Sequence, residues 1–351
     1  MPPDGSPAPS RGRQLLAWGL RLGRPAVAVL ILVTIGYTIA SRWTGSPGKP
    51  GISDALRTLA WPSLLLSLVA VFAGTVTSLL AWRALLADEG YPLRAVAAAR
   101  IFLVGQLGKY LPGSVWAVVL QMELARREHV PRGRAFTTSL AFIGLSLSTG
   151  LTVGLLGLPV LAAAHHAVLW WLLAALPVLV VASLPPVLTR LVNLVLRLWR
   201  KGPLPRPLSW SGVLSAAAWL AGTWTFFGLH LWLLANALGA PGLGGLARCI
   251  GGFALAMAAG VLFVVAPSGT GVREIVIVAA LSPVMPTAEA LGVAVVSRAL
   301  FVVADVGSAG AAALSGWRSL RRTPLPAREA VPARDPLRPE PSRHRETAAG
   351  G

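Results

Sequence analysis

Two short motifs bring polar and ionisable side chains into otherwise apolar stretches of the chain. The residues that could do chemistry in them are Gln106, Lys109, Tyr110, Trp116, Arg273 and Glu274. Ionisable residues inside apolar segments are costly, and they commonly mark a site for a substrate, an ion or a proton. The free N–H groups at helix breaks favour anions. Together with Lys109 and Arg273, they predict a site for an anionic group such as a phosphate headgroup.

Acidic residues near these motifs are candidates for charge pairing or proton transfer. We expect Glu274 to pair with Lys109 or Arg273 when the site is empty, or to relay a proton. Arg298 and Asp305 lie seven residues apart in the last apolar segment, so they share one helix face. We expect them to pair with each other or with charges of the second motif, and to take part in the same relay.

Both motifs also contain residues that interrupt helices. These residues are Gly108, Pro112, Gly113, Pro267, Gly269 and Gly271. In lipid, a helix break leaves backbone groups without partners, which is tolerated only inside protein or beside a wet cavity. The alternative interpretation is a pair of structural kinks, with Lys109 reaching to the membrane interface.

The scarcity of charge places the chain in a membrane. Charged residues make up 13% of its 351 residues, against about 25% in soluble proteins. Residues 135–189 and 207–247 contain no Asp, Glu, Lys or Arg, and about 20 apolar helical residues suffice to cross a bilayer. The net charge of +18 lies in short loops and in the tail, as the positive-inside rule expects, and no nucleic-acid-binding pattern accompanies it.

The apolar segments predict an all-α, polytopic membrane protein with about six full spans. The predicted spans are residues 26–40, 61–86, 135–160, 167–188, 212–238 and 287–314. The first is expected to be an uncleaved span, with a cleavable signal peptide as the alternative. Residues 190–206 are expected to form a basic cytoplasmic loop. Both termini are expected in the cytoplasm, and the protein in the cell (plasma) membrane.

Four further segments are expected to form two re-entrant pairs of half-helices. Residues 93–108 and 114–125 have basic residues at both ends and would enter from the cytoplasm. Residues 246–265 and 272–281 would enter from outside, but the former are also long enough for a full span. Each pair lies between two spans, in opposite orientations, which is the order of an inverted repeat. This interpretation rests on charge bias and segment length.

The chain divides into a basic N-terminal segment (1–24), a membrane domain (25–316) and a Pro/Arg-rich tail (317–351) that we expect to be disordered. Cys249 is the only cysteine, which excludes an intrachain disulfide. We expect Cys249 and His230 to be core residues. No metal-ligand spacing, nucleotide-binding motif or nucleophile motif is recognised, so neither an enzyme nor a metal or other cofactor is expected.

The strings G-Q-L-G-K-Y-L-P-G-S-V-W (residues 105–116) and P-S-G-T-G-V-R-E (residues 267–274) resemble the two motifs of the lysylphosphatidylglycerol synthase transmembrane region family. Members are often called flippase-like proteins. The resemblance covers roughly residues 25–316, and Ser268 stands where the family motif commonly has glycine. It implies a lipid-translocating membrane domain. Bifunctional members also contain a soluble aminoacyl-transferase domain, which this sequence lacks, so aminoacyl transfer is not expected.

We therefore expect a flippase-like protein that translocates or binds an anionic (phospho)lipid or a polyprenyl-phosphate-linked lipid. Without an ATPase motif, transport would be passive or ion-coupled, with Glu274 or Asp305 as the proton site. The alternative is a non-transporting scaffold or accessory subunit of a membrane-associated glycosyltransferase or lipid synthase, docked through residues 190–206 and the tail. A third hypothesis is a secondary transporter of a small soluble anion.

Overall fold

The computed structural model describes residues 53, 57, 59–111, 115–157, 174–239, 242–263 and 269–322. Within these ranges every regular element is a helix, which confirms the predicted all-α class. Several predicted features lie outside the described residues: the first span (26–40), the N-terminal segment 1–24, the tail beyond residue 322, and the helix breakers Pro112, Gly113 and Pro267.

Five helices in the described part are long and apolar enough to cross a membrane. They are α3 (Trp61–Asp88), α6 (Arg132–Leu156), α11 (Trp210–Ala237), α12 (Gly242–Leu262) and α14 (Thr287–Arg322). The shortest, α12, has 21 residues and rises about 31 Å, which matches a hydrocarbon core of about 30 Å. The chain is a multi-pass membrane protein. α14 continues past the domain boundary predicted at residue 316.

The largest departure from the predicted topology lies between α6 and α11. In place of a span at 167–188 and a basic loop at 190–206, α9 (Leu176–Ser183) and α10 (Pro185–Leu198) form a pair bent by 80°. Leu184 is extended (φ −68°, ψ 140°), as a following proline requires, and Pro185 then starts the next helix. Counted as one broken span, the pair brings the candidates in the described part to six.

The first motif lies in a hairpin of short helices between α3 and α6. Its first arm contains α4 (Ala95–Ala99), a π-helical turn η1 (Arg100–Val104) and a 3₁₀ turn η2 (Leu107–Tyr110), and its second arm is α5 (Trp116–Arg127). Helical elements therefore occupy both predicted half-helix segments. The arms approach closely at Gly108, where a Cβ atom would meet the backbone of Trp116 and Ala117. Glycine permits this approach because it has no side chain.

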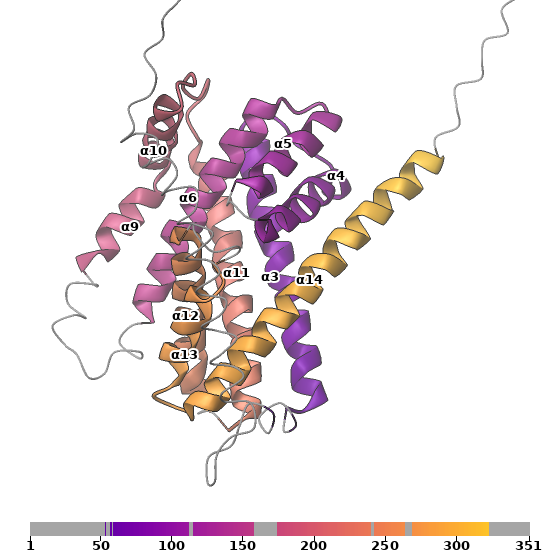
Figure 1. Ribbon diagram of the computed structural model, residues 1–351. Helices are drawn as coiled ribbons and strands as arrows, with labels where there is room; N and C mark the ends of the chain where they lie inside the picture. The colour runs from indigo at the N-terminus through magenta and orange to yellow at the C-terminus, as the bar shows by residue number, and fades with distance from the viewer. Residues whose placement is uncertain are drawn as a thin grey trace, which may run out of the picture.

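The second motif lies between α12 and the ten-residue α13 (Val272–Leu281), and these two helices form the second hairpin. α12 is long enough to cross by itself, whereas α13 rises only about 15 Å. Gly269, at φ +64°, begins the described part of the return, and a Cβ atom on it would meet the backbone of Gly260 in α12. In Figure 1, α13 lies toward the end of the molecule where α14 begins, and α4 and α5 lie at the opposite end. This opposed arrangement agrees approximately with the predicted inverted repeat.

Two apolar clusters hold the hairpins in place. The first packs around α4 and η1, where the rings of Phe102 and Phe142 meet at 5.4 Å between centroids. The second packs around α12 and α13, where the rings of Phe253 and Phe301 stack at 5.4 Å. α3 and α11 pack against each other and contribute to both clusters. They form the frame on which the hairpins and α14 are placed.

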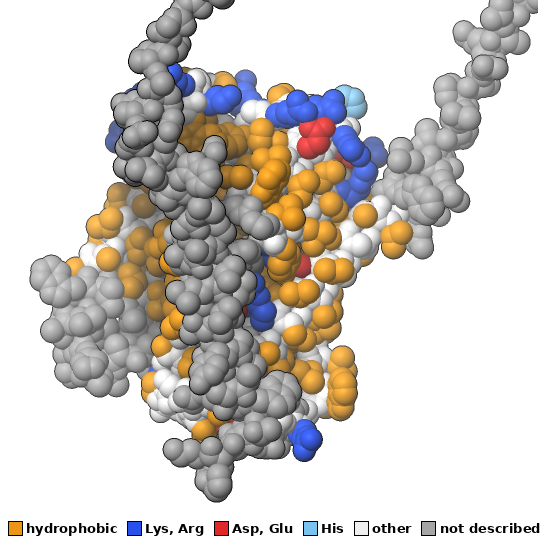
Figure 2. Space-filling model, in the orientation of Figure 1, with side chains coloured by type: hydrophobic (Ala, Val, Ile, Leu, Met, Phe, Trp, Pro, Cys, Tyr) orange, Lys and Arg blue, Asp and Glu red, His pale blue; other side chains and the backbone are white. Residues whose placement is uncertain are grey.

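Basic side chains gather at one end of the molecule. Figure 2 shows blue side chains concentrated at the end where α5 and α10 lie, above a mainly orange face. Exposed basic residues in α5, in α6 and from α10 to α11 are Arg126, Arg127, Arg132, Arg190, Arg197, Arg200, Lys201 and Arg206. Hydrogen bonds from the Arg132 and Arg126 guanidinium groups to Glu123 lower the pKa of that carboxyl. This charge asymmetry is the feature that relates the fold to the two sides of a membrane.

Candidate functional site

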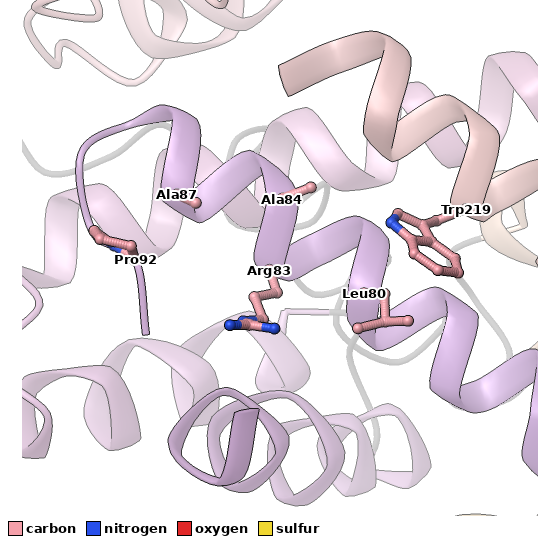
Figure 3. A pocket seen from close by; sticks show the side chains of 6 residues that line it. All are labelled: Leu80, Arg83, Ala84, Ala87, Pro92 and Trp219. Carbon is pink, nitrogen blue, oxygen red and sulfur yellow. The ribbon is translucent and has the colours of Figure 1, made fainter. Parts of the chain in front are cut away.

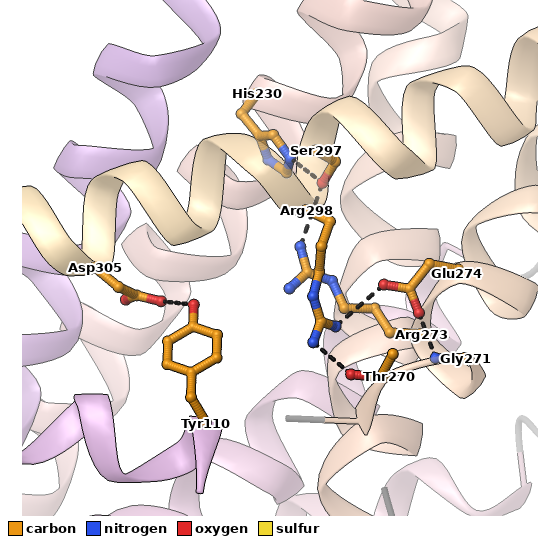
Figure 4. A network of polar contacts seen from close by, with 9 residues as sticks. All are labelled: Tyr110, His230, Thr270, Gly271, Arg273, Glu274, Ser297, Arg298 and Asp305. Carbon is orange, nitrogen blue, oxygen red and sulfur yellow. Dashed lines mark hydrogen bonds and ion pairs between the residues drawn. The ribbon is translucent and has the colours of Figure 1, made fainter. Parts of the chain in front are cut away.

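α14 presents Arg298 and Asp305 toward the two hairpins (Figure 4). They are seven positions apart, so they project from the same side of the helix about 10 Å apart along its axis. α14 contacts η1 and η2 of the first hairpin and α13 of the second. The side chain of Asp305 is 7% exposed and that of Arg298 is 22% exposed. One helix therefore offers a buried anion to one hairpin and a partly accessible cation to the other.

The end of the first hairpin arm binds Asp305 through two donors. The Lys109 ammonium lies 2.7 Å from the Oδ2 atom of Asp305. The Tyr110 hydroxyl donates to the same oxygen at 2.5 Å. The Lys109 side chain is 28% exposed, so the ion pair lies at the edge of the packed interior. Adjacent residues of η2 thus converge on a single carboxylate oxygen of α14.

The start of α13 binds Arg298. Arg298 donates from Nη1 to Glu274 Oε1 at 3.1 Å and from Nη2 to Thr270 Oγ1 at 2.5 Å. The other carboxylate oxygen of Glu274 accepts the backbone N–H of Gly271 at 2.6 Å, which caps the first turn of α13. Gly271 has φ +94°, a conformation that glycine adopts without strain. The glycine-rich break therefore fixes the position of Glu274.

Arg273 is the most deeply placed cation of the site, at 4% exposure. Its guanidinium lies 4.7 Å and 4.3 Å from the ring centroids of Phe253 and Phe301. This is the geometry of a cation–π interaction on two rings. The guanidinium also donates to Ser297 Oγ at 3.3 Å. Stacking on two rings restricts its motion, and no carboxylate of the described residues lies within ion-pair distance of it.

His230 completes the chain of contacts behind Arg273. Its Nε2 atom lies 2.9 Å from Ser297 Oγ, and its Nδ1 atom is paired with the carbonyl of Phe227. Since a carbonyl can only accept, Nδ1 carries a proton, and in a neutral imidazole Nε2 then accepts from the Ser297 hydroxyl. The Ser297 Oγ atom then accepts the hydrogen bond from the Arg273 guanidinium. The expectation that His230 is a core histidine with its partners satisfied is confirmed.

We call these joined side chains the charged network. Its five formally charged members give it a net positive charge. Lys109, Arg273 and Arg298 contribute three positive charges, and Glu274 and Asp305 contribute two negative charges. Within the described ranges, Arg273 forms no ion pair. A buried unneutralised cation attracts an anion strongly, because the low dielectric screens it little. The arrangement is suited to binding a further anionic group.

The structure brings together six of the predicted site residues, but not in all the predicted pairs. They are Lys109, Tyr110, Arg273, Glu274, Arg298 and Asp305. Glu274 was expected to pair with Lys109 or Arg273, and it pairs with Arg298 instead. The alternative pairing of Arg298 with the second motif is thus the one found. Two motifs from opposite ends of the fold are joined through α14.

The remaining predicted residues lie beside this network. Gln106 is half-buried on the first arm, and no hydrogen bond joins it to the network among the residues that the structure describes. Trp116 begins α5 and is 44% exposed. Sequence reasoning missed Ser297, although it precedes Arg298 directly. It also missed Phe253, for which an apolar helix gives no distinguishing signal.

A shallow pocket of about 220 Å³ lies elsewhere, between the end of α3 and α11 (Figure 3). Its lining residues are Leu80, Arg83, Ala84, Ala87, Pro92 and Trp219. Arg83 donates to the carbonyl of Leu93 at 2.9 Å, which fixes the turn before α4. No residue of the charged network lines this pocket. In the described part of the chain, no group of three or more His, Cys, Asp or Glu side chains is placed to hold a metal ion.

Comparison with known proteins identifies one family. The family model described as "Lysylphosphatidylglycerol synthase TM region" matches residues 26–306. This match covers most of the chain, including both hairpins and the network as far as Asp305. No curated protein matches the chain.

Proposed function

This chain belongs to the Lysylphosphatidylglycerol synthase TM region family, and on that premise we propose that it binds an anionic lipid headgroup between its two hairpins and moves that lipid across the membrane. One observation is central to the proposal. Tyr110 and Asp305, 195 residues apart in sequence, meet in a network with a surplus of positive charge. Broken helices that meet near the middle of a membrane protein commonly line a substrate site.

The headgroup would exchange places with the two carboxylates. Lys109 and Arg298 are partly exposed, and each is held by a carboxylate of the protein. A phosphate oxygen can replace Asp305 on Lys109, and the planar guanidinium of Arg298 can donate two parallel bonds to phosphate. Arg273 lies behind them as a fixed charge. The ion pairs of the empty site would thus reform as contacts to the ligand.

Exposed apolar side chains beside the network favour a lipid over a small soluble anion. On α14, Val302, Val303 and Val306 are 39%, 54% and 57% exposed, and they flank Asp305. At the first hairpin, Leu111 and Val115 are 47% and 53% exposed. In a membrane-spanning helix such surfaces face acyl chains. A headgroup at the network could therefore leave its chains in the bilayer.

The proposed substrates are an anionic phospholipid and a polyprenyl-phosphate-linked lipid, and we assign the chain no catalytic step of its own.

The charge asymmetry supports an orientation in the plasma membrane. With the basic end in the cytoplasm, the first hairpin opens inward and the second opens outward. We propose that both termini are cytoplasmic; the end of α14 at the basic end of the molecule supports this for the C-terminus. Transport is passive or coupled to protons through Glu274 or Asp305.

The test is translocation of fluorescently labelled phosphatidylglycerol in proteoliposomes. Lys109→Ala and Glu274→Ala are expected to lower the protein-dependent rate at least about tenfold. Lys109→Ala removes a charge-assisted contact to the headgroup of about 1.5–3 kcal/mol, and Glu274→Ala removes the carboxylate that must pair with Arg298 again when the lipid leaves. Arg57→Ala, an exposed change outside the network, is the matched control. Size-exclusion profiles and melting temperatures show whether each variant is folded.

Wild-type rates in both folded variants would refute the proposed site. Failure of the wild-type protein to move either phosphatidylglycerol or a labelled polyprenyl phosphate would refute the transport function. Capture of a glycosyltransferase or lipid synthase by that inactive protein, lost when the tail is deleted, would support the scaffold alternative.

A further inference from the structure

α10 differs from the spans because it has a buried apolar face, an exposed apolar row and exposed arginines within 14 residues. Leu188, Val192 and Leu196 are buried against the protein, with at most 3% exposure. A second apolar row recurs at spacings of three and four along another face and consists of Val187, Leu191, Leu194 and Leu198. Its three leucines are exposed: Leu191 by 44%, Leu194 by 53% and Leu198 by 74%. Burying such a leucine row is favourable by about 25 cal/mol per Å². The exposed row therefore requires an apolar environment.

A basic strip borders this exposed row. Arg190 and Arg197 are seven residues apart on the same side of α10, and both are exposed. Arg200, Lys201 and Arg206 follow directly and are also exposed. Residues 185–206 contain no Asp or Glu. A helix with an apolar row beside a strip of arginines is typical of helices that lie in a membrane interface.

The packing of α10 holds these faces in a fixed orientation. Its axis is bent by 80° from α9, so α10 lies across the direction of the preceding helix. At its end, the Trp199 ring lies 5.4 Å from the ring of Phe136, in the first turns of α6. The following segment folds back, and the N–H of Leu204 donates to Asn193 Oδ1 at 2.8 Å. α10 is therefore fixed at the basic end of the molecule.

We propose that α10 is an interfacial helix that binds the anionic leaflet at the basic end of the protein. Leu191, Leu194 and Leu198 enter the edge of the hydrocarbon, and Arg190 and Arg197 bind phosphate groups of anionic phospholipids. Lipid is the favoured occupant because α9, directly before α10 in a membrane-spanning chain, also exposes Val178, Val180 and Val181, and the charged residues of 185–206 are all basic. The proposal is independent of lipid translocation.

The depth of Leu194 can be measured in the full chain. A nitroxide is attached to Leu194→Cys in a Cys249→Ala background, in nanodiscs containing phosphatidylcholine and phosphatidylglycerol. Its collisions with oxygen and with a water-soluble nickel complex are compared with those of labels at Val69→Cys, on an exposed position of α3 (63%), and at Gly202→Cys, after α10. We expect Leu194 to be intermediate, with oxygen favoured over nickel. Nickel accessibility equal to that of Gly202 would overturn the proposal, and so would shielding from both reagents, which would indicate a protein surface.

The role of the arginines is tested by local lipid preference. A fluorophore at Leu194→Cys is quenched with spin-labelled phosphatidylglycerol and, separately, with spin-labelled phosphatidylcholine. The ratio of the two is expected to exceed one and to fall several-fold in Arg190→Gln/Arg197→Gln, by up to about fivefold per arginine. Arg57→Gln, an exposed change near the start of α3, should leave the ratio unchanged. An equal ratio in the double variant and the wild type would overturn the assignment.

Discussion

A single oxygen of Asp305 receives both donors of the first motif, which makes it the residue that most directly controls the site. Lys109 and Tyr110 converge on Oδ2, so the carboxylate occupies the position that an oxygen of an anionic ligand would take. The two cannot be bound by the same donors at once. Under the proposed function, Asp305 is therefore an internal competitor of the headgroup.

Replacement of Asp305 by the isosteric asparagine should strengthen binding of anions. Asp305→Asn removes one negative charge and releases a charge-assisted contact of about 1.5–3 kcal/mol, so affinity for short-chain phosphatidylglycerol should rise about tenfold. Translocation should slow, because the ligand leaves a tighter site more slowly. Isothermal titration in detergent measures the first effect. Tyr110→Phe, which keeps every charge, should change affinity less than threefold, and unchanged or weaker binding by folded Asp305→Asn would refute the competition.

Arg273 shows why residue type matters inside this site. Its planar guanidinium can stack on Phe253 and Phe301 and still donate to Ser297. A lysine ammonium has no plane to stack and is more strongly hydrated. The hydrogen bond between Ser297 and His230 fixes the acceptor that orients Arg273. These residues position the charge and do not need to contact the ligand.

At the scale of elements, close backbone packing at Gly108 sets the shape of the first hairpin. A Cβ atom there would meet the backbone of Trp116 and Ala117, which cannot rotate away as a side chain can. Gly108→Ala should therefore destabilise the protein by about 1–3 kcal/mol and lower its melting temperature by several degrees. Gly133→Ala, in a helix with open space around it, should be neutral or stabilising by about 0.5–1 kcal/mol. Thermal unfolding followed by size exclusion compares them, and equal melting temperatures would contradict this account of the hairpin.

The long helices could be predicted because their sequences leave few alternatives. The charge-free run at 207–247 predicts a span, and α11 (Trp210–Ala237) is found there. α10 was missed because its arginines suggested a loop, although Leu188, Val192 and Leu196 repeat with helical spacing. Its helix is decided by Pro185 and by tertiary packing, which local charge does not reveal.

The sequence indicated which residues belong to the site, but not which of them pair with each other. Glycine, proline and charge in apolar segments pointed to Lys109 and Glu274, but sequence spacing cannot tell which helix faces each of them. Arg298 and Asp305 could be assigned to one face of α14 from their spacing alone. That Glu274 faces Arg298 depends on the angle between α13 and α14, which is set by packing in the second apolar cluster.

At the scale of the whole molecule, α14 joins the two hairpins. It pairs with Lys109 near one hairpin tip and with Glu274 near the other, and it contacts α3 and α11. A ligand that breaks one ion pair therefore acts on the same rigid helix that holds the other. This linkage offers a physical route by which binding at one hairpin affects the opposite one.

The most direct test of the central claim is a cryo-electron microscopy structure in nanodiscs containing phosphatidylglycerol, with a bound antibody fragment for alignment. We predict headgroup density between Lys109 and Arg298, with Asp305 displaced from Lys109 and acyl-chain density beside Val302 and Val306. Lipid density confined to the outer surfaces, with both ion pairs intact and nothing between the hairpins, would contradict the account.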